Sequence, residues 1–236
     1  MKIPPNKLTT LLDQVSMGGL VDPVKLTFTD DGIKVSQLDI TRTLGVIAKI
    51  DKVQFKEYQP IGDILINADI IKRLNKFFKT DDSIELTVAS DTLKAIGSIE
   101  TFEADLPSEE VPELKTETKE TDYGVVLGKP QILAAFYLDM NEVKSDYGER
   151  RTLIFNQNGL SMKIQEDVFR YDKRIRVMKK NVSQDGQVIV NADVLNEVCG
   201  LCKGPAWIIF TEGPIQICYK EVGFQATYII APMTEG

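Results

Sequence analysis

The sequence predicts an α+β protein made of two copies of one folding unit, each with two helices on antiparallel sheet. The first observation is an internal repeat, because three short segments recur in the same order 124 to 127 residues further along the chain. The matched segments are 66–71 with 190–195, 28–33 with 155–160, and 105–107 with 230–232. The second observation is that each copy has two stretches with helical spacing of apolar residues among many strand-like stretches joined by turns. Hairpin-linked strands favour antiparallel sheet, and 236 residues suffice for two such domains.

The first copy is expected to begin with a helix that Asn6 caps and to contain a second helix that Asn67 opens. The apolar residues at helical spacing are Leu8, Leu11, Leu12 and Val15 in the first helix and Ile70, Ile71, Leu74, Phe77 and Phe78 in the second. Strands are expected at 24–28, 33–50, 84–89 and 93–104, with turns at Asp30-Asp31-Gly32 and Ser90-Asp91.

The second copy is expected to repeat this order. Its helices are predicted from Ile132, Leu133, Phe136, Met140 and Val143, and, after Asn191, from Val194, Leu195, Val198 and Leu201. Its strands are expected around 153–155, 160–165, 169–177, 188–190, 207–210, 215–219 and 224–230.

An acidic stretch joins the two copies. Residues 103–122 contain eight acidic residues and two lysines, so this stretch holds −6 of the chain's net charge of −7. It includes proline and has no apolar periodicity, which is typical of an extended linker. We therefore expect an N-terminal domain over residues 1–107, a connecting loop over 108–122 and a C-terminal domain over 123–236.

The residues that most catalytic sites need are missing or isolated. The chain has no histidine, which excludes a Ser-His-Asp triad, a Cys-His couple and a histidine-ligated zinc. Asp30-Asp31 and Asp81-Asp82 stand where turns need aspartate, so they are interpreted as turns and not as metal ligands. Cys199 and Cys202 have CxxC spacing without a second pair, and we expect buried thiols. We therefore expect that the protein is not an enzyme and that it binds no cofactor.

Cysteine usage and hydropathy indicate the compartment. Three cysteines, Cys199, Cys202 and Cys218, do not make a disulfide framework and fit a reducing, intracellular location. No stretch approaches 18 uninterrupted apolar residues, and the first 25 residues have no apolar core of a signal peptide. We expect an intracellular protein without a membrane partner.

The helix after Asn67 carries the clearest charge pattern. Lys72, Lys76 and Lys79 lie on one face opposite the apolar stripe, with Arg73 beside them. The fourteen residues from Asn67 onward have a net charge of +3 in an acidic chain. Two interpretations stay open: an ordinary solvated helix face, or a row of cations that follows a phosphate backbone without reading bases.

Two expected edge strands have opposite charge. The basic run 169–180 lies in the second copy, and the acidic segment 100–105 ends the first. Basic residues also protect edge strands from aggregation. The alternative is head-to-tail pairing between subunits, which closes into a ring if the rotation permits. The residues expected at that contact are Thr101, Phe102 and Glu103 on one edge and Arg170, Arg174 and Arg176 on the other.

Three motifs in register over essentially the whole chain carry a family resemblance. They are Leu106-Pro107-Ser108-Glu109-Glu110-Val111-Pro112-Glu113-Leu114, then Glu212-Gly213-Pro214-Ile215-Gln216-Ile217-x-Tyr219, and finally Tyr228-x-x-Ala231-Pro232. With these motifs the sequence resembles the DNA sliding clamps, specifically the proliferating cell nuclear antigen (PCNA) family of the archaeal and eukaryotic type.

The resemblance implies a DNA-clamp fold in which three two-domain chains close into a ring around duplex DNA. The ring would be a homotrimer, with a heterotrimer as the alternative, and helices would line its hole. Such a ring tethers DNA polymerase, the clamp loader and other replication and repair proteins, without reading DNA sequence. The residues that would contact DNA are Lys7, Lys72, Arg73, Lys76, Lys79, Lys144, Arg150, Arg151 and Lys203.

The resemblance also implies a pocket for the short client motif known as the PIP box. Its lining, carried over by position, would be Leu38, Val46, Val111, Leu114, Pro214, Ile229, Ala231 and Pro232. An extended connector beside an apolar patch is a place for a partner segment to dock. This chain departs from the family pattern at the stretch 40–43, at Gly45, and at Ile229, where the family has tyrosine.

Three other interpretations remain. A monomeric, viral-type processivity factor would bind DNA by one basic face, and a checkpoint-clamp subunit would assemble only with other chains. The third, from a different class, is a metal-dependent enzyme that uses pairs of Asp and Glu.

Overall fold

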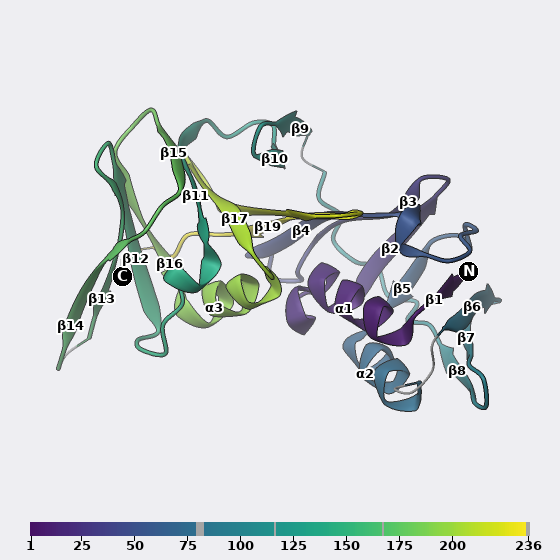
Figure 1. The fold of residues 1–236 in the computed structure, drawn as a ribbon. Coiled ribbons are helices and arrows are strands. Elements are labelled where there is room, and N and C mark those ends of the chain that lie inside the picture. The colour runs from purple at the N-terminus through teal and green to yellow at the C-terminus, as the bar shows by residue number, and fades with distance from the viewer. Residues whose placement is uncertain (79–82, 116, 167, 235–236) are drawn as a thin grey trace. The chain divides into compact units, whose positions relative to one another are not determined.

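The computed structural model of the protein describes residues 1–78, 83–115, 117–166 and 168–234. The chain divides into two units (Figure 1). Unit 1 comprises Met1–Leu114 and Glu221–Ala226, and unit 2 comprises Lys115–Lys220 and Thr227–Gly236. Both units combine α-helix with antiparallel strands, which confirms the predicted α+β class.

Unit 1 has two strand groups and two α-helices. Its elements are β1 (Lys2–Ile3), α1 (Pro5–Val15), η1 (Met17–Gly19), β2 (Val24–Thr29), β3 (Gly32–Leu38), β4 (Leu44–Asp51), η2 (Lys52–Gln54), β5 (Ile64–Ile66), α2 (Ala68–Phe77), β6 (Ile84–Ala89), β7 (Thr92–Ile96) and β8 (Thr101–Asp105). One group has the strand order β4-β3-β2-β5 and the other β1-β6-β7-β8. The two helices lie side by side (Figure 1).

Local capping explains where the helices of unit 1 begin. The side chain of Asn67 accepts a hydrogen bond from the Ile70 amide at 2.9 Å, which confirms Asn67 as the N-cap of α2. The expectation that Asn6 caps α1 is wrong, because Pro4 is the N-cap and Pro5 occupies the first turn. The fixed φ of proline suits that position, and the missing N–H costs nothing there.

The apolar stripes of both helices are buried, with one exception. Leu8, Leu11, Leu12 and Val15 are buried in α1, as are Ile70, Ile71 and Leu74 in α2. Phe78, at the C-terminal end of α2, is also buried, but Phe77 is half-exposed. The ring of Phe77 lies 5.5 Å from that of Phe102 on β8, so this part of α2 faces the edge strand.

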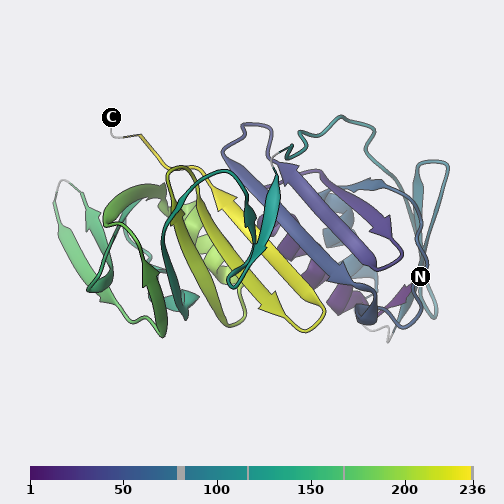
Figure 2. The same cartoon turned by 90° about the horizontal axis from the view of Figure 1, so that it is seen from above.

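Unit 2 has one α-helix among its described residues. Its elements are β9 (Thr118–Thr121), β10 (Gly124–Leu127), β11 (Ile132–Asp139), η3 (Met140–Glu142), β12 (Arg150–Asn156), β13 (Gly159–Gln165), β14 (Arg170–Ile175), β15 (Lys179–Val182), β16 (Gly186–Asn191), α3 (Ala192–Leu201), β17 (Pro205–Thr211), β18 (Ile215–Glu221) and β19 (Phe224–Ile230). The strand orders are β15-β11-β17-β18-β19 and β14-β13-β12-β16. The hairpin β9–β10 lies on the face of the first group opposite α3 (Figures 1 and 2).

The helix expected over 132–143 is a strand followed by a 3₁₀ turn, so that prediction is wrong. β11 pairs with β15 on one side and β17 on the other, and Ala134, Ala135 and Phe136 are all buried. A strand buried on both faces has no alternating pattern, and its apolar spacing cannot be told from that of a buried helix. Unit 2 therefore has a single α-helix where the repeat predicted two.

The second helix of the repeat is confirmed. The side chain of Asn191 accepts from the Val194 amide at 3.0 Å, so Asn67 and Asn191 cap equivalent helices. Leu195, Val198 and Cys199 are buried against unit 2.

The expected connecting loop over 108–122 includes the boundary between the two units. Residues 108–114 belong to unit 1 and 115–122 to unit 2, where part of them forms β9. The tip of the β9–β10 hairpin packs on β17, with the Tyr123 and Trp207 rings 4.7 Å apart. The hairpin therefore has a packed apolar side that its acidic sequence did not indicate.

Candidate nucleic-acid and protein-contact surfaces

The exposed face of α2 presents Lys72 and Lys76 to solvent. Both side chains are exposed, and they lie one helical turn apart, opposite the buried Ile71 and Leu74. Arg73 is also exposed but lies on a flank of the helix, where it borders β8. Lys79 lies outside the described residues. Of the row of cations predicted from the sequence, the described structure therefore shows two lysines, Lys72 and Lys76, on the exposed face of α2.

The neighbouring helix adds little charge to this surface. Lys7, half-buried, is the lysine of α1, and Asp13 is exposed on the same helix. The packing of α1 beside α2 therefore gives unit 1 one helical layer whose described cations are concentrated on α2.

Three of the expected DNA contacts in unit 2 lie on loops and strand ends. Lys144 follows η3 and is half-buried against α3, since a Cβ on Gly200 would be 3.4 Å from its Nζ. Arg150 is exposed at the start of β12, and Lys203 is exposed just after α3. A cation at the C-terminal end of a helix is favoured by the helix dipole, which accounts for the position of Lys144.

Arg151 is not a surface residue, and its predicted contact with DNA is wrong. Its exposed fraction is 0%, and its guanidinium donates hydrogen bonds to the backbone carbonyls of Ser145, Tyr147 and Gly148. Burial lowers the pKa of Arg151. Because successive side chains of a strand point to opposite faces, only one of two adjacent arginines could face outward, and that one is Arg150.

β8 is the edge of its sheet among the described residues, as the sequence predicted for residues 101–103. Thr101 and Glu103 are exposed, while Phe102 is buried on the side of α2. Glu103 forms an ion pair with Lys94 of β7 at 2.7 Å. A cavity of about 270 Å³ lies between this strand and α2.

β14 is the corresponding edge in unit 2. Arg170 and Arg174 point to one face together with Asp172, which pairs with Arg170 at 3.2 Å. Arg174 donates to the Asn158 carbonyl at 3.1 Å. Arg176 is exposed but lies beyond the end of β14, so the structure does not place it in the edge strand with the other two.

The connector runs along the edge of β3 in unit 1. The Leu38 amide donates to the Pro112 carbonyl at 2.9 Å, and Val111 and Leu114 are half-buried beside it. Lys25 holds Glu113 at 2.8 Å. The hydrogen bond that Lys25 donates to the Glu113 carboxylate is the main cause that raises the pKa of Lys25.

Two of the expected pocket residues present little surface. Val46 has an exposed fraction of 0% in the interior of β4, so its assignment to an open pocket is wrong. Ile229 is also buried, whereas Leu38 is half-exposed. Every second residue of an interior strand points into the core. The resemblance to the family did not fix the register at Gly45, and so it did not show that Val46 points inward.

The remaining pocket residues are in unit 2. Pro214 is half-exposed in the turn between β17 and β18, where its carbonyl accepts from the Thr211 hydroxyl at 2.8 Å. Ala231 is half-exposed and Pro232 exposed. The following amide, of Met233, donates to the Ile189 carbonyl at 2.8 Å and so fixes the course of the tail along β16.

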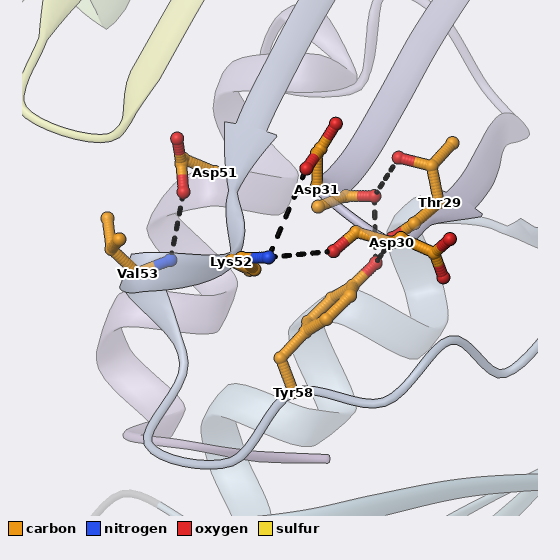
Figure 3. A network of polar contacts seen from close by, with 8 residues as sticks. Thr29, Asp30, Asp31, Asp51, Lys52, Val53 and Tyr58 are labelled. Atoms are coloured by element: carbon orange, nitrogen blue, oxygen red, sulfur yellow. Dashed lines mark hydrogen bonds and ion pairs between the residues drawn. The ribbon is translucent and has the colours of Figure 1, made fainter.

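The aspartates considered as metal ligands form a turn (Figure 3). The Asp30 carbonyl accepts from Lys52 Nζ at 3.3 Å, and the Asp31 carboxylate lies 4.0 Å from the same Nζ. The Tyr58 hydroxyl is shared between the Thr29 and Gly32 carbonyls at 2.8 and 2.7 Å, and burial raises its pKa. The turn interpretation of this pair is confirmed, and Asp81-Asp82 lie outside the described residues.

Neither the acidic nor the thiol groups of the described chain form a metal cluster. No three His, Cys, Asp or Glu side chains converge there as ligands. The three cysteines are unpaired and buried, as predicted, and burial raises the pKa of Cys202 and of Cys218 to about 12 and that of Cys199 further. None of the helices in the described ranges is long and apolar enough to cross a membrane.

The fold of the chain is similar to that of the DNA sliding clamps. PCNA of A. fulgidus, solved with the C-terminal region of FEN-1 bound, superposes with a TM-score of 0.77 and 18% identity over 100% of this chain and 98% of that one. The PCNA2–PCNA3 complex of Sulfolobus tokodaii gives 0.75 and 16% over 99% of each chain. PCNA of Entamoeba histolytica gives 0.77 and 14% over 99% and 98%. No protein-family model and no curated protein sequence matches the chain. The likeness to the solved structures, at 14–18% identity, shows the fold alone.

Proposed function

We propose that this protein is a DNA sliding clamp, which encircles duplex DNA and tethers replication and repair enzymes without catalysing a reaction itself. The observation that carries the proposal is the clamp fold over the whole chain, combined with an exposed lysine pair on α2 in a protein of net charge −7. A protein that acts by topology and docking needs no catalytic site. The charge distribution fits this role, because residues 103–122 hold −6 of the net charge of −7, whereas residues 67–80 have a net charge of +3.

Contact with DNA would be loose and independent of base sequence. Lys72 and Lys76 have long, flexible side chains that neutralise phosphates without fixing a register. Such contacts are individually weak and strongly dependent on salt, which is compatible with sliding.

The two edge strands support a ring of identical chains. β8 presents Glu103 and Asp105, and β14 presents Arg170 and Arg174, so one edge of a copy is complementary to the other edge of the next. Such a head-to-tail contact closes into a ring when the rotation between copies permits it. We infer three copies from the likeness to PCNA, and the self-complementary charges favour a homotrimer over a heterotrimer.

Clients would dock at apolar segments that each unit presents by itself, the connector in unit 1 and the C-terminal tail in unit 2. The half-buried Val111 and Leu114 offer apolar surface on one segment, and Ala231 and Pro232 on the other. A short client segment with apolar and aromatic anchors, such as those of DNA polymerase or the clamp loader, suits a surface of this kind. A. fulgidus PCNA, which was solved with the C-terminal region of FEN-1 bound, gives a precedent for a partner segment bound to this fold.

Replacing Lys72 and Lys76 by alanine tests the assignment of the DNA face. We expect weaker binding to duplex DNA and a salt dependence whose slope falls by about 0.9 for each lost lysine–phosphate contact. Fluorescence anisotropy of a labelled duplex over a series of salt concentrations measures both quantities. Lys129→Ala with Lys220→Ala removes the same charge from exposed positions of unit 2 and should change the slope little. Equal slopes for all three proteins would refute the assignment.

A further inference from the structure

The cavity between α2 and β8 has a chemically mixed lining. Ile70 and Phe102 give it an apolar side, and Asp69 and Arg73 give it a polar side. Its volume of about 270 Å³ is large enough for one aromatic side chain. Phe102 and Ala104 reach it from β8, so the cavity lies on the helix side of the edge strand.

The alternation of side chains defines two faces on each edge strand. On β8, Phe102 and Ala104 point to the side of α2, whereas strand alternation directs the side chains of Glu103 and Asp105 to the opposite face, although both residues also line the cavity. On β14, Tyr171 is paired with the buried Ile164 and therefore shares the core side of its sheet, while Arg170 and Arg174 take the opposite side.

Adding β14 of a second copy to the free edge of β8 joins these faces in pairs. Where the carboxylates of β8 meet the arginines of β14 on one face, the cavity side of β8 must meet the core side of β14. The opposite orientation would place arginines over the apolar part of the cavity and on the face away from the carboxylates of β8. Charge complementarity therefore selects the orientation.

One side chain on the core side of β14 is able to enter the cavity. Ile175 is buried in its own unit, and Lys173 is held there by Glu142, whose carboxylate lies 3.0 Å from its Nζ. Tyr171 has an exposed fraction of 43%. A tyrosine ring suits the apolar side of the cavity, and its hydroxyl suits the polar side.

We propose that Tyr171 of a second copy inserts into the cavity between α2 and β8 and anchors the contact between chains. This inference rests on the proposed ring. It gives the interface a buried aromatic at its centre, the type of residue that dominates binding energy in protein interfaces. It also assigns Arg73, which the sequence placed among the DNA contacts, to the lining of the assembly contact.

A disulfide test locates the side chain directly. Ala104→Cys with Tyr171→Cys places one thiol in the cavity and one on the inserting strand, and mild oxidation should link chains into covalent dimers and trimers. Ala104→Cys with Asp172→Cys is the matched control, because its second thiol lies on the opposite face without removing an interface arginine, and a disulfide requires close, facing Cβ atoms. The native thiols are buried with raised pKa values and should not contribute.

Dissociation of the ring provides an independent readout. We expect Tyr171→Ala to raise the dissociation constant between chains roughly 30-fold or more, as for an interface hot spot, while Val222→Ala, which removes another exposed apolar side chain, leaves it unchanged. Mass photometry over a dilution series measures both. An oligomeric wild type with neither the disulfide nor the dissociation would overturn the role of Tyr171 and leave the ring intact. A wild-type chain that stays monomeric at every concentration would overturn the homotrimer and this inference together.

Discussion

Reversing two charges on β14, Arg170→Glu with Arg174→Glu, is expected to give a folded chain that no longer assembles. Both side chains are exposed on the face of β14 that would meet Glu103 and Asp105 of the next copy. The substitutions turn two opposite-charge contacts into like-charge contacts, which cost several kcal/mol in an interface. Within unit 2 they remove an exposed ion pair with Asp172, which contributes little to stability. Light scattering at micromolar concentration should therefore report the mass of one chain, with an unchanged melting curve.

Compensating substitutions on β8 make this test specific. A chain that also carries Glu103→Lys and Asp105→Lys has opposite charges at every contact and should assemble again. A chain with only the β14 reversal, mixed with a chain with only the β8 reversal, should not form a closed trimer. Matched contacts require the two chains to alternate, and a ring of three must contain one unmatched pair. If the chain with Arg170→Glu and Arg174→Glu still forms a ring, β14 is rejected as the interface edge. A monomeric wild type that still stimulates a polymerase would instead favour the monomeric processivity factor.

The parts of the fold that were predictable depend on local chemistry. Asn67 and Asn191 were recognisable as caps because an asparagine before an apolar run satisfies free amides of the first helical turn. The turn at Asp30-Asp31-Gly32 was recognisable for a similar reason: Gly32 has a φ of +139°, and a Cβ there would lie 2.0 Å from the Ile50 carbonyl oxygen. The charged edges were visible because edge strands tolerate long runs of charge.

The errors arise where distant residues decide the outcome. β11 is a strand because β15 and β17 pair with it on both sides, and its own spacing fits a helix equally well. The hairpin β9–β10 forms within acidic sequence because Val126 joins a buried cluster with Ile209 of a strand 80 residues away. The sequence did not indicate a role for Tyr171, because this residue stands in a strongly basic run. Only its register with β13 places it on the core side of the sheet.

Replacing Arg151 by methionine is expected to destabilise the fold without acting through DNA. Its buried guanidinium donates hydrogen bonds to three backbone carbonyls between Ser145 and Gly148. The carboxylates of Asp193, Asp146 and Glu166 favour its charged form and oppose the effect of burial on its pKa. Methionine fills similar space but leaves the carbonyls without donors, and each buried, unsatisfied group costs roughly 1–3 kcal/mol. We expect the free energy of unfolding to fall by about 3 kcal/mol, which corresponds to a decrease in Tm of roughly 6–12 °C.

Arg150→Met is the matched control, since it removes the same charge one residue away. Arg150 is exposed, so its loss should change the free energy of unfolding by no more than about 0.5 kcal/mol. If Arg150 contacts phosphate, its loss should weaken binding to duplex DNA and reduce the salt dependence, whereas the Arg151 variant, measured well below its Tm, should keep both. Scanning calorimetry and anisotropy on the two variants separate the roles that adjacent arginines have on opposite faces of one strand. An Arg151 variant with unchanged stability and weakened DNA binding would return this residue to the DNA-contacting set.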